Sequence, residues 1–280
     1  MIRYSLFILL LISAVACYEP TEGCLDRDAN NFDVAADFPC ANEDCCTYPE
    51  LAIRAAASWG GEEMRFDTTY EDGAGNMFQL TRLRLYLSEI ELPISTSDTL
   101  TPVDSIDVRV FVAVGDTIDQ TLNSNLVLVD QTSSSGSQLS VGEFRQSFES
   151  TNLAFRLGMR DPYRSVIPES LSSGHPLARQ EGLLNFSDGN GYVLAKLEYQ
   201  LPNVFPDSTL VFSLYGDVEQ NLALPAYGPF SLGADLTVDL SLDHQLLFES
   251  VDLRSDSADL ADDLLLVLPQ VVSISSVTED

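Results

Sequence analysis

Two histidines, His175 and His244, are the side chains in this 280-residue chain best suited to chemistry. Hydrolytic triads and most transition-metal sites depend on imidazole. His175 precedes a proline, so we expect it in a loop, where its ring can face solvent or a ligand. His244 follows the alternating apolar run 236–242, so we expect it at a strand end as a hydrogen-bonded surface residue. On residue type alone, a surface role is the more common one for both.

Known catalytic motifs do not occur in the sequence. Serine is abundant, but there is no Gly-x-Ser-x-Gly turn, no Walker loop and no zinc-protease helix motif. The sequence Gly189-Asn190-Gly191 indicates a turn and not a phosphate-binding loop. The 43 acidic residues leave a paired-carboxylate glycosidase site open, but they single out no pair. We therefore predict a protein that is not an enzyme and has no catalytic residues.

Five cysteines lie at the N-terminal end: Cys17, Cys24, Cys40, Cys45 and Cys46. In an oxidising compartment the last four predict two disulfides, with three possible pairings. A direct bond between the adjacent Cys45 and Cys46 would be strained, so each is expected to reach back to Cys24 or Cys40. A zinc site is the alternative, although no histidine is near.

The first sixteen residues have the pattern of an export signal. One positive charge is followed by the apolar run 6–12 and a small-residue exit, 13–16, and the run is too short to span a membrane. A cysteine directly after Ala14-Val15-Ala16 indicates a lipobox, so we expect residues 1–16 to be removed and a lipid to be attached to Cys17. The alternative is an ordinary signal that leaves Cys17 as a free thiol. We predict a lipid-anchored protein of the cell envelope, at the outer membrane and facing the periplasm or the cell surface.

Residues 17–49 form a cysteine-rich segment with too few apolar residues to bury a core, so disulfides must hold it together. Within it, the spacing of Asp26, Asp28 and Asn30 hints at a calcium loop. Asn31 stands where that loop requires glycine. A solvated spacer is therefore the favoured interpretation of the 26–33 segment, and we expect no calcium there.

The formal net charge of −29 restricts the partners. Such an acidic surface repels nucleic acid and anionic lipid headgroups. The lipid anchor then accounts for membrane association, and an envelope protein is the remaining candidate partner.

From residue 50 onward the pattern is one of short strands separated by turns, which predicts an all-β domain over residues 50–280. We expect an antiparallel β-sandwich of the immunoglobulin-like or jelly-roll type. The predicted strands are 80–92, with a break in alternation at Ser88-Glu89, and 108–114, 125–130, 192–200, 209–215, 235–242 and 264–268. The best helix candidates are 257–266 and 141–149, and the Ser-rich segment 131–138 predicts a loop.

Four passages, taken in order, resemble the MbnP-like family of extracytoplasmic copper-binding proteins. They are Leu51-Ala52-Ile53-Arg54 with Trp59; residues 70–78; Leu83-Arg84-Leu85-Tyr86-Leu87-Ser88-Glu89-Ile90-Glu91-Leu92; and His175-Pro176-Leu177 with residues 190–198. The resemblance implies a β-sandwich that holds copper outside the cytoplasm, in some members through histidines and a tryptophan oxidised to kynurenine. Imidazole is a sound copper ligand.

Carried over to this sequence, the resemblance makes His175 a copper ligand. Two departures weaken it: Phe186 and Asp188 stand where the family usually has tryptophans, and Tyr215 stands where a histidine is common. His244 can take part only if it comes near His175. Trp59 is either the oxidisable residue or a core aromatic. The sequence thus leaves two functions open, a copper-binding lipoprotein and a metal-free structural or interaction module on the envelope.

Overall fold

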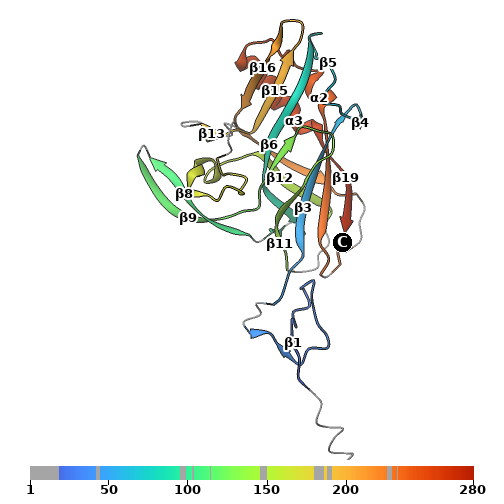
Figure 1. The fold of residues 1–280 in the computed structure, drawn as a ribbon, viewed down its shortest axis with the longest axis vertical. Coiled ribbons are helices and arrows are strands. Elements are labelled where there is room, and N and C mark those ends of the chain that lie inside the picture. Colours follow the sequence, from blue (N-terminus) through green and yellow to red (C-terminus); the bar gives the residue numbers. More distant parts are fainter. Residues whose placement is uncertain are drawn as a thin grey trace, which may run out of the picture.

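The protein consists of a small N-terminal knot attached to a β-rich body (Figure 1). This computed structural model describes residues 19–41, 45–94, 99–102, 104–113, 115–145, 150–179, 186–187, 191–225, 229–231 and 233–280. The lipid-attachment position predicted at Cys17 lies outside these residues. No helix in the described ranges is long and apolar enough to cross a membrane.

The larger of two main sheets has eight strands and is organised around the long strand β6 (Met77–Pro93). Its path runs β16 (Phe205–Leu214), β15 (Ala195–Leu201), β6, β12 (Asn152–Gly158) and β17 (Asp217–Ala223). Three further strands pair with β6: β5 (Tyr70–Glu71), β7 (Thr99–Leu100) and β10 (Val127–Gln131). All these pairings are antiparallel.

The smaller main sheet has five strands and packs against the larger one. Its order is β11 (Gln138–Glu143), β3 (Glu50–Trp59), β18 (Leu236–Asp243) and β19 (Val272–Glu279), with β4 (Glu62–Glu63) paired to β3. The β3–β18 pair is parallel and the other pairs are antiparallel. The predicted all-β sandwich is therefore confirmed, with this one parallel pair inside it.

Alternation of apolar and polar residues decides what each face of β6 contacts. Leu83, Leu85 and Leu87 belong to the core between the sheets, which also contains Ile53 of β3 and Val238 of β18. The intervening side chains point to the outer face of the larger sheet. A second apolar cluster covers part of that outer face, with Tyr86, Val108, Val110, Met159, Tyr163, Val166, Leu177 and Tyr192 among its members.

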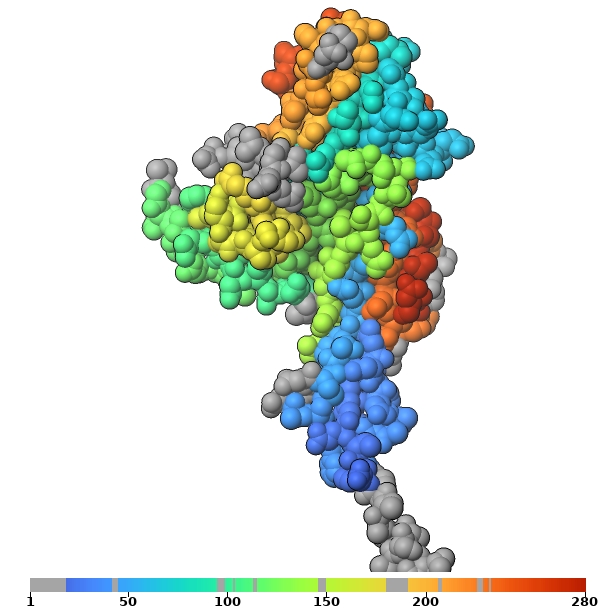
Figure 2. All heavy atoms as spheres, in the orientation of Figure 1, coloured from blue at the N-terminus to red at the C-terminus, as the bar shows by residue number. Residues whose placement is uncertain are grey.

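A protruding hairpin and a turn-rich segment build this outer cluster (Figure 2). The hairpin consists of β8 (Ser105–Ala113) and β9 (Asp116–Asn123). The segment contains the 3-10 turns η2 (Tyr163–Ser165) and η3 (Pro168–Ser170), and Val166 forms a bridge with Val110 of the hairpin. Two short strands that follow this segment in the sequence, β13 (Phe186–Ser187) and β14 (Gly191–Tyr192), pair with each other.

Two helices near the C-terminus close one side of the core. Helix α2 (His244–Phe248) directly follows β18, and α3 (Ser257–Val271) begins at an N-cap, Asp256, whose carboxylate accepts hydrogen bonds from the backbone of residues 258 and 259. Leu260, Leu264 and Leu268 of α3 are buried in the core at helical spacing. The strand predicted at 264–268 is therefore wrong, whereas the helix predicted at 257–266 is confirmed.

The other predicted helix, 141–149, is wrong over its described part. Residues 141–143 belong to β11, which pairs with β3, residues 144 and 145 are not helical, and 146–149 lie outside the described residues. The segment is apolar only at Val141 and Phe144 within the described part, and both side chains are buried in the core. Tertiary pairing with β3 decides the conformation here.

Two disulfides hold the N-terminal knot, together with the short parallel pair β1 (Glu22–Gly23) and β2 (Phe38–Pro39). Cys24 bonds to Cys46 and Cys40 to Cys45, so each of the adjacent cysteines reaches back as expected. The knot docks on the body through one carboxylate oxygen of Asp235, which accepts hydrogen bonds from the Asn30 side chain and the Glu50 amide.

Candidate functional site

A β-bulge in β6 creates a polar concave surface on the larger sheet. The pairing of β6 with β12 shifts by one residue between Ala154 and Arg156, opposite the stretch 88–91. At this point Glu89 adopts a positive φ of 50°, which is uncommon for a residue other than glycine. The extra residue returns Ile90 to the core and leaves the side chains of Glu89 and Glu91 on the outer face. The bulge thus places the carboxylates of Glu89 and Glu91 on the same face of the sheet.

Glu89 is held by two arginines. One carboxylate oxygen accepts from Nε of Arg160 at 2.6 Å, and the other accepts from Nε of Arg156 at 3.3 Å. Arg156 also forms ion pairs with Asp217 and, at 3.5 Å, with Glu219 on β17. The proximity of Glu89 raises the pKa of Arg160, first through the hydrogen bond and then through charge. Both arginines are therefore neutralised by carboxylates of the protein itself.

Asn125 forms the inner wall of the same hollow. Its backbone carbonyl accepts from the Ile90 amide, and its side-chain Nδ2 donates to the Ile90 carbonyl at 3.2 Å. These two bonds continue the β10–β6 ladder and fix which amide atom is oxygen. The remaining atom, Oδ1, is buried and has no hydrogen-bond partner in the part of the chain that the structure describes. The residue is only 3% exposed, so this acceptor is held away from bulk water.

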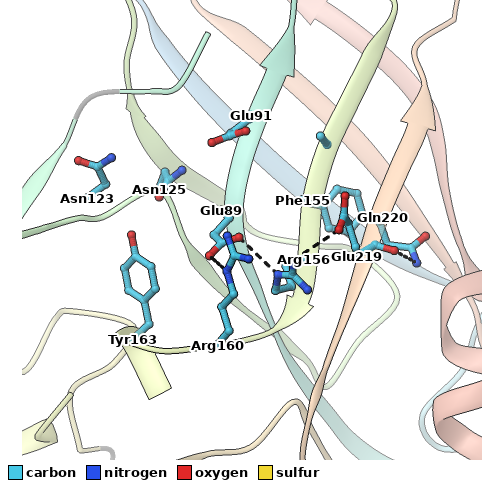
Figure 3. Close-up of a pocket in the computed structure, with 11 residues that line it drawn as sticks. Glu89, Glu91, Asn123, Asn125, Phe155, Arg156, Arg160, Tyr163, Glu219 and Gln220 are labelled. Carbon is cyan, nitrogen blue, oxygen red and sulfur yellow. Dashed lines mark hydrogen bonds and ion pairs between the residues drawn. The ribbon is translucent and has the colours of Figure 1, made fainter. Parts of the chain in front are cut away.

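Together these residues line a pocket of about 370 Å³ (Figure 3). Its walls come from β6, β12, β17, the end of β9 with the connection to β10, and η2 with the turn before it. The lining residues are Glu89, Glu91, Asn123, Asn125, Ala154, Phe155, Arg156, Arg160, Tyr163, Glu219 and Gln220. Three carboxylates face two guanidinium groups, so the lining carries one excess negative charge.

Tyr163 presents its hydroxyl toward Asn123 and Asn125 in this pocket (Figure 3). Burial raises the pKa of the Tyr163 phenol, and the negative charges of Glu89 and Glu91 raise it further. The phenol is therefore protonated at neutral pH, and it can donate one hydrogen bond and accept another. The pocket combines this protonated phenol with a lining that carries a net negative charge.

His175 contacts the β9–β10 connection, which contributes Asn125 to the pocket, through Ser124. Its Nδ1 accepts a hydrogen bond from the Leu177 amide at 3.1 Å, and its Nε2 is 3.1 Å from the Ser124 hydroxyl. Because Nδ1 accepts, the neutral ring carries its proton on Nε2 and donates to Ser124. Burial lowers the pKa of His175, while Asp104 acts in the opposite direction. Leu177 belongs to the outer cluster, so this histidine belongs to the outer face of the larger sheet.

His244 lies in a different layer. The residue is 1% exposed, so the surface position expected for it is wrong. Its Nε2 is 2.9 Å from Oε1 of Gln131, whose own Nε2 donates to the Ala55 carbonyl. The ring packs edge-on to Phe66 and parallel to Phe248. Burial lowers the pKa of His244 to about 4, so the ring is neutral in the folded protein at neutral pH.

The two histidines are not brought together. Their partners, Ser124 and Gln131, lie before and at the end of strand β10, which alone spans about 13 Å. His175 packs with the outer cluster, whereas His244 lies between the sheets beside core residues. A metal ion bound by one imidazole is out of reach of the other.

The other predicted site residues, Trp59, the 26–33 segment and the cysteines, make contacts within the protein that suit a structural role. Trp59 stacks on Tyr70 with ring centroids 3.9 Å apart and packs against the core. In the 26–33 segment, the carboxylate of Asp26 accepts from the Asp28 amide and from the hydroxyl of Tyr48. Over the described residues, the one group of three His, Cys, Asp or Glu with metal-binding spacing is Cys40, Cys45 and Cys46, which are disulfide-bonded.

The sequence matches the MbnP family model over residues 48–263, most of the chain. The chain belongs to the MbnP family. Among solved structures it is similar to MbnP from Methylosinus trichosporium, with a TM-score of 0.43 and 16% sequence identity, covering 72% of this chain and 78% of that one. No curated protein sequence matches it.

In this MbnP family member, the pocket could not be predicted from the sequence, although one irregularity in the sequence marks its position. The alternation of β6 breaks at Ser88-Glu89, and this break is the bulge. Its other walls lie 36 to 131 positions from Glu89 along the chain, at Asn125, Arg156 and Gln220. Their arrival at the bulge depends on strand register, which the sequence does not state.

Proposed function

We propose that this MbnP family member is a lipid-anchored binding module of the cell envelope that works without a histidine-bound copper ion. The observation that carries the proposal is the placement of the two imidazoles in different layers of the sandwich, hydrogen-bonded near opposite ends of β10. Copper sites built on imidazole need more than one ligand converging on the ion. The histidine pair cannot supply them.

The envelope location rests on the N-terminal features. The export pattern of residues 1–16 and the cysteine that follows it support export and lipid attachment at Cys17. The two disulfides of the knot suit an oxidising compartment. The knot then serves as a stalk between the anchor and the sandwich, with the pocket on the outer face of the larger sheet.

Copper handling through His175 alone is the second candidate function. It is favoured by the position of His175 in the passage that resembles the family, and by a half-buried ring whose lowered pKa keeps it neutral. Against it, Nδ1 already accepts from Leu177 and Nε2 donates to Ser124. Copper would have to displace one of these bonds, and no second imidazole is near. The residues present therefore do not fit a multi-histidine copper centre.

Copper stoichiometry tests the proposal. The full chain, purified in a neutral detergent, is loaded with Cu(I) or Cu(II), desalted and assayed by elemental analysis, next to the variants His175→Ala and His244→Gln. We expect far less than one copper per chain in all three proteins, because no converging ligand set exists. Retention of about one copper per chain that is lost in His175→Ala would establish the copper function instead.

A further inference from the structure

We propose that the two disulfides of the N-terminal knot form a relay for a dithiol reductant. In this relay, the reduction of Cys40–Cys45 is passed on to Cys24–Cys46 by thiol–disulfide exchange. The partner class is a dithiol, that is, a molecule with two neighbouring thiol groups.

The sulfur atoms that take part in the exchange already lie together. The Sγ atoms of Cys40, Cys45 and Cys46 are all within 4.8 Å of one another. Cys40 is bonded to Cys45, whereas Cys46 is bonded to Cys24. One disulfide therefore lies beside a sulfur atom of the other. Exchange requires this kind of approach, because a thiolate must attack a disulfide sulfur directly.

Access decides which of the two bonds an external dithiol attacks first. Cys24 is only 2% exposed, so its sulfur is shielded, whereas Cys40 and Cys45 are not buried. Cys40–Cys45 also closes the shorter loop, with a sequence separation of 5 against 22 for Cys24–Cys46. In the chain-entropy description, the bond that closes the shorter loop stabilises the fold less. Reduction therefore begins at Cys40–Cys45.

The first step transfers two electrons and two protons from the dithiol to the Cys40–Cys45 bond. One thiolate of the dithiol attacks the Sγ of Cys45, and Cys40 leaves as a thiolate. The second thiol of the reductant then displaces Cys45 from this mixed disulfide. The reductant leaves as a disulfide, and both cysteines are now thiols in equilibrium with their thiolates.

The second step needs no further reductant. The Cys40 thiolate attacks the Sγ of Cys46, the new bond between these two residues forms, and the bond from Cys46 to Cys24 breaks. Cys24 leaves as a thiolate and takes up the proton that Cys40 released. The carbonyl oxygen of Asp26 lies 3.8 Å from the Cys24 Sγ, so it can accept a hydrogen bond from the new thiol. Cys45 does not replace Cys40 as the attacker, because a bond to the adjacent Cys46 would be strained.

The exchange changes what holds the N-terminal stalk together. Cys24–Cys46 joins two residues 22 positions apart at a Cα–Cα distance of 5.1 Å. After the exchange, Cys24 keeps hydrogen bonds such as the one that its carbonyl oxygen accepts from the Asp33 amide at 2.8 Å. The stretch 24–40 is then free of its covalent clamp and can extend to roughly 50 Å. A longer stalk would let the sandwich move away from the membrane, and this consequence rests on the lipid anchor proposed above.

Disulfide mapping of the full chain in neutral detergent tests the relay. The probe is dithiothreitol, which is added for a short time and stopped by acid. Free thiols are then alkylated at low pH, and the remaining disulfides are identified by mass spectrometry of peptides. The crossed pair Cys40–Cys46 is the product that two independent disulfides cannot give. The variants Cys45→Ser and Cys40→Ser form a matched pair, because each leaves one free thiol in the knot without any reductant.

In the natural chain, we expect Cys40–Cys46 in at least about a tenth of the molecules that keep one disulfide, with Cys24 and Cys45 alkylated. In Cys45→Ser, the free thiol of Cys40 should form the same crossed pair without dithiothreitol. In Cys40→Ser, the free thiol is that of Cys45, so the Cys24–Cys46 bond should persist and Cys24 should stay unlabelled.

Three results would overturn the inference. The first is a natural chain whose one-disulfide forms contain only Cys24–Cys46 or Cys40–Cys45. The second is a Cys24–Cys40 pair as abundant as Cys40–Cys46, which would indicate random pairing in an unfolded knot. The third is equal alkylation of Cys24 in the two variants. The natural chain decides the question where a variant fails to fold, and the copper assay, which concerns the histidines, is independent of all three results.

Discussion

The two ends of strand β10 hold histidines in opposite circumstances. Near the start of β10, His175 contacts Ser124. This histidine is half-buried on the outer face and is hydrogen-bonded through both ring nitrogens. At the end of β10, Gln131 contacts His244. This histidine is fully buried between the sheets and is hydrogen-bonded through Nε2, while its Nδ1 forms no hydrogen bond with a described group. The difference shows that one imidazole is part of the core, whereas the other supports the connection that forms a pocket wall. Four stability measurements test this difference between the two histidines.

The largest effect is expected for His244→Ala. This change removes a ring packed against Phe66 and Phe248 and leaves the oxygen of Gln131 without its donor. Loss of buried ring volume and of one hydrogen bond should lower the free energy of unfolding by about 3 to 4 kcal/mol in urea titrations. A loss below about 1 kcal/mol would show that His244 is not a core residue.

The next effect is the pH dependence that His244 imposes on stability. Burial lowers its folded-state pKa to about 4 from the ordinary 6.5, so the unfolded chain binds more protons between these values. The stabilising contribution is complete above pH 6.5 and is lost as the pH falls toward 4, by about 3 kcal/mol in total. Subtracting the urea stability of His244→Leu at each pH isolates this contribution from the many carboxylates. A pH-independent difference would contradict the burial of a neutral ring.

A smaller effect is expected for Glu89→Gln at the pocket end of the sheet. The variant weakens the ion pairs with Arg156 and Arg160, in a place where Arg156 is only 14% exposed. We expect a loss of about 1 kcal/mol at low salt that shrinks in 1 M sodium chloride, because salt screens partly exposed charges. Asp67→Asn, which breaks the exposed pair with Arg65, is the control and should give no measurable change. Equal losses of stability in both variants would show that the ion pairs of Glu89 contribute no more than an exposed surface pair.

The smallest loss is expected for His175→Ala. The residue gives up hydrogen bonds with Ser124 and Leu177, but water can replace them at a half-buried position. The free energy of unfolding should fall by about 0.5 kcal/mol, at the lower end of what a hydrogen bond contributes, because water replaces the lost partners. A loss as large as that of His244→Ala would mean that the two ends of β10 do not differ as described.

Much of the fold could be predicted from the sequence, because local pattern and cysteine chemistry determine it. The alternation over 80–92 predicted β6, and the adjacency of Cys45 and Cys46 restricted the disulfide pairing correctly. The apolar run 264–268 was ambiguous between strand and helix, and the Asp256 N-cap together with the spacing of buried leucines favours the helix.

The candidate site could be predicted only in part. His175 was correctly expected in a loop, and the break at Ser88-Glu89 correctly marked an irregularity. The partners of that irregularity come from the β9–β10 connection, β12 and β17, through pairings that only the folded sheet defines. The burial of His244 likewise depends on Phe66 and Gln131, far away in the sequence.

An NMR experiment on the two histidine rings tests directly whether they can share one metal ion. The full chain is labelled with ¹³C,¹⁵N-histidine, the two ring signals are assigned with His244→Gln, and a small fraction of an equivalent of Cu(II) is added. Because the rings lie in different layers near opposite ends of β10, we predict that the His244 ring signals stay sharp whatever happens to those of His175. Simultaneous broadening of both rings would place them around one copper ion and contradict the account.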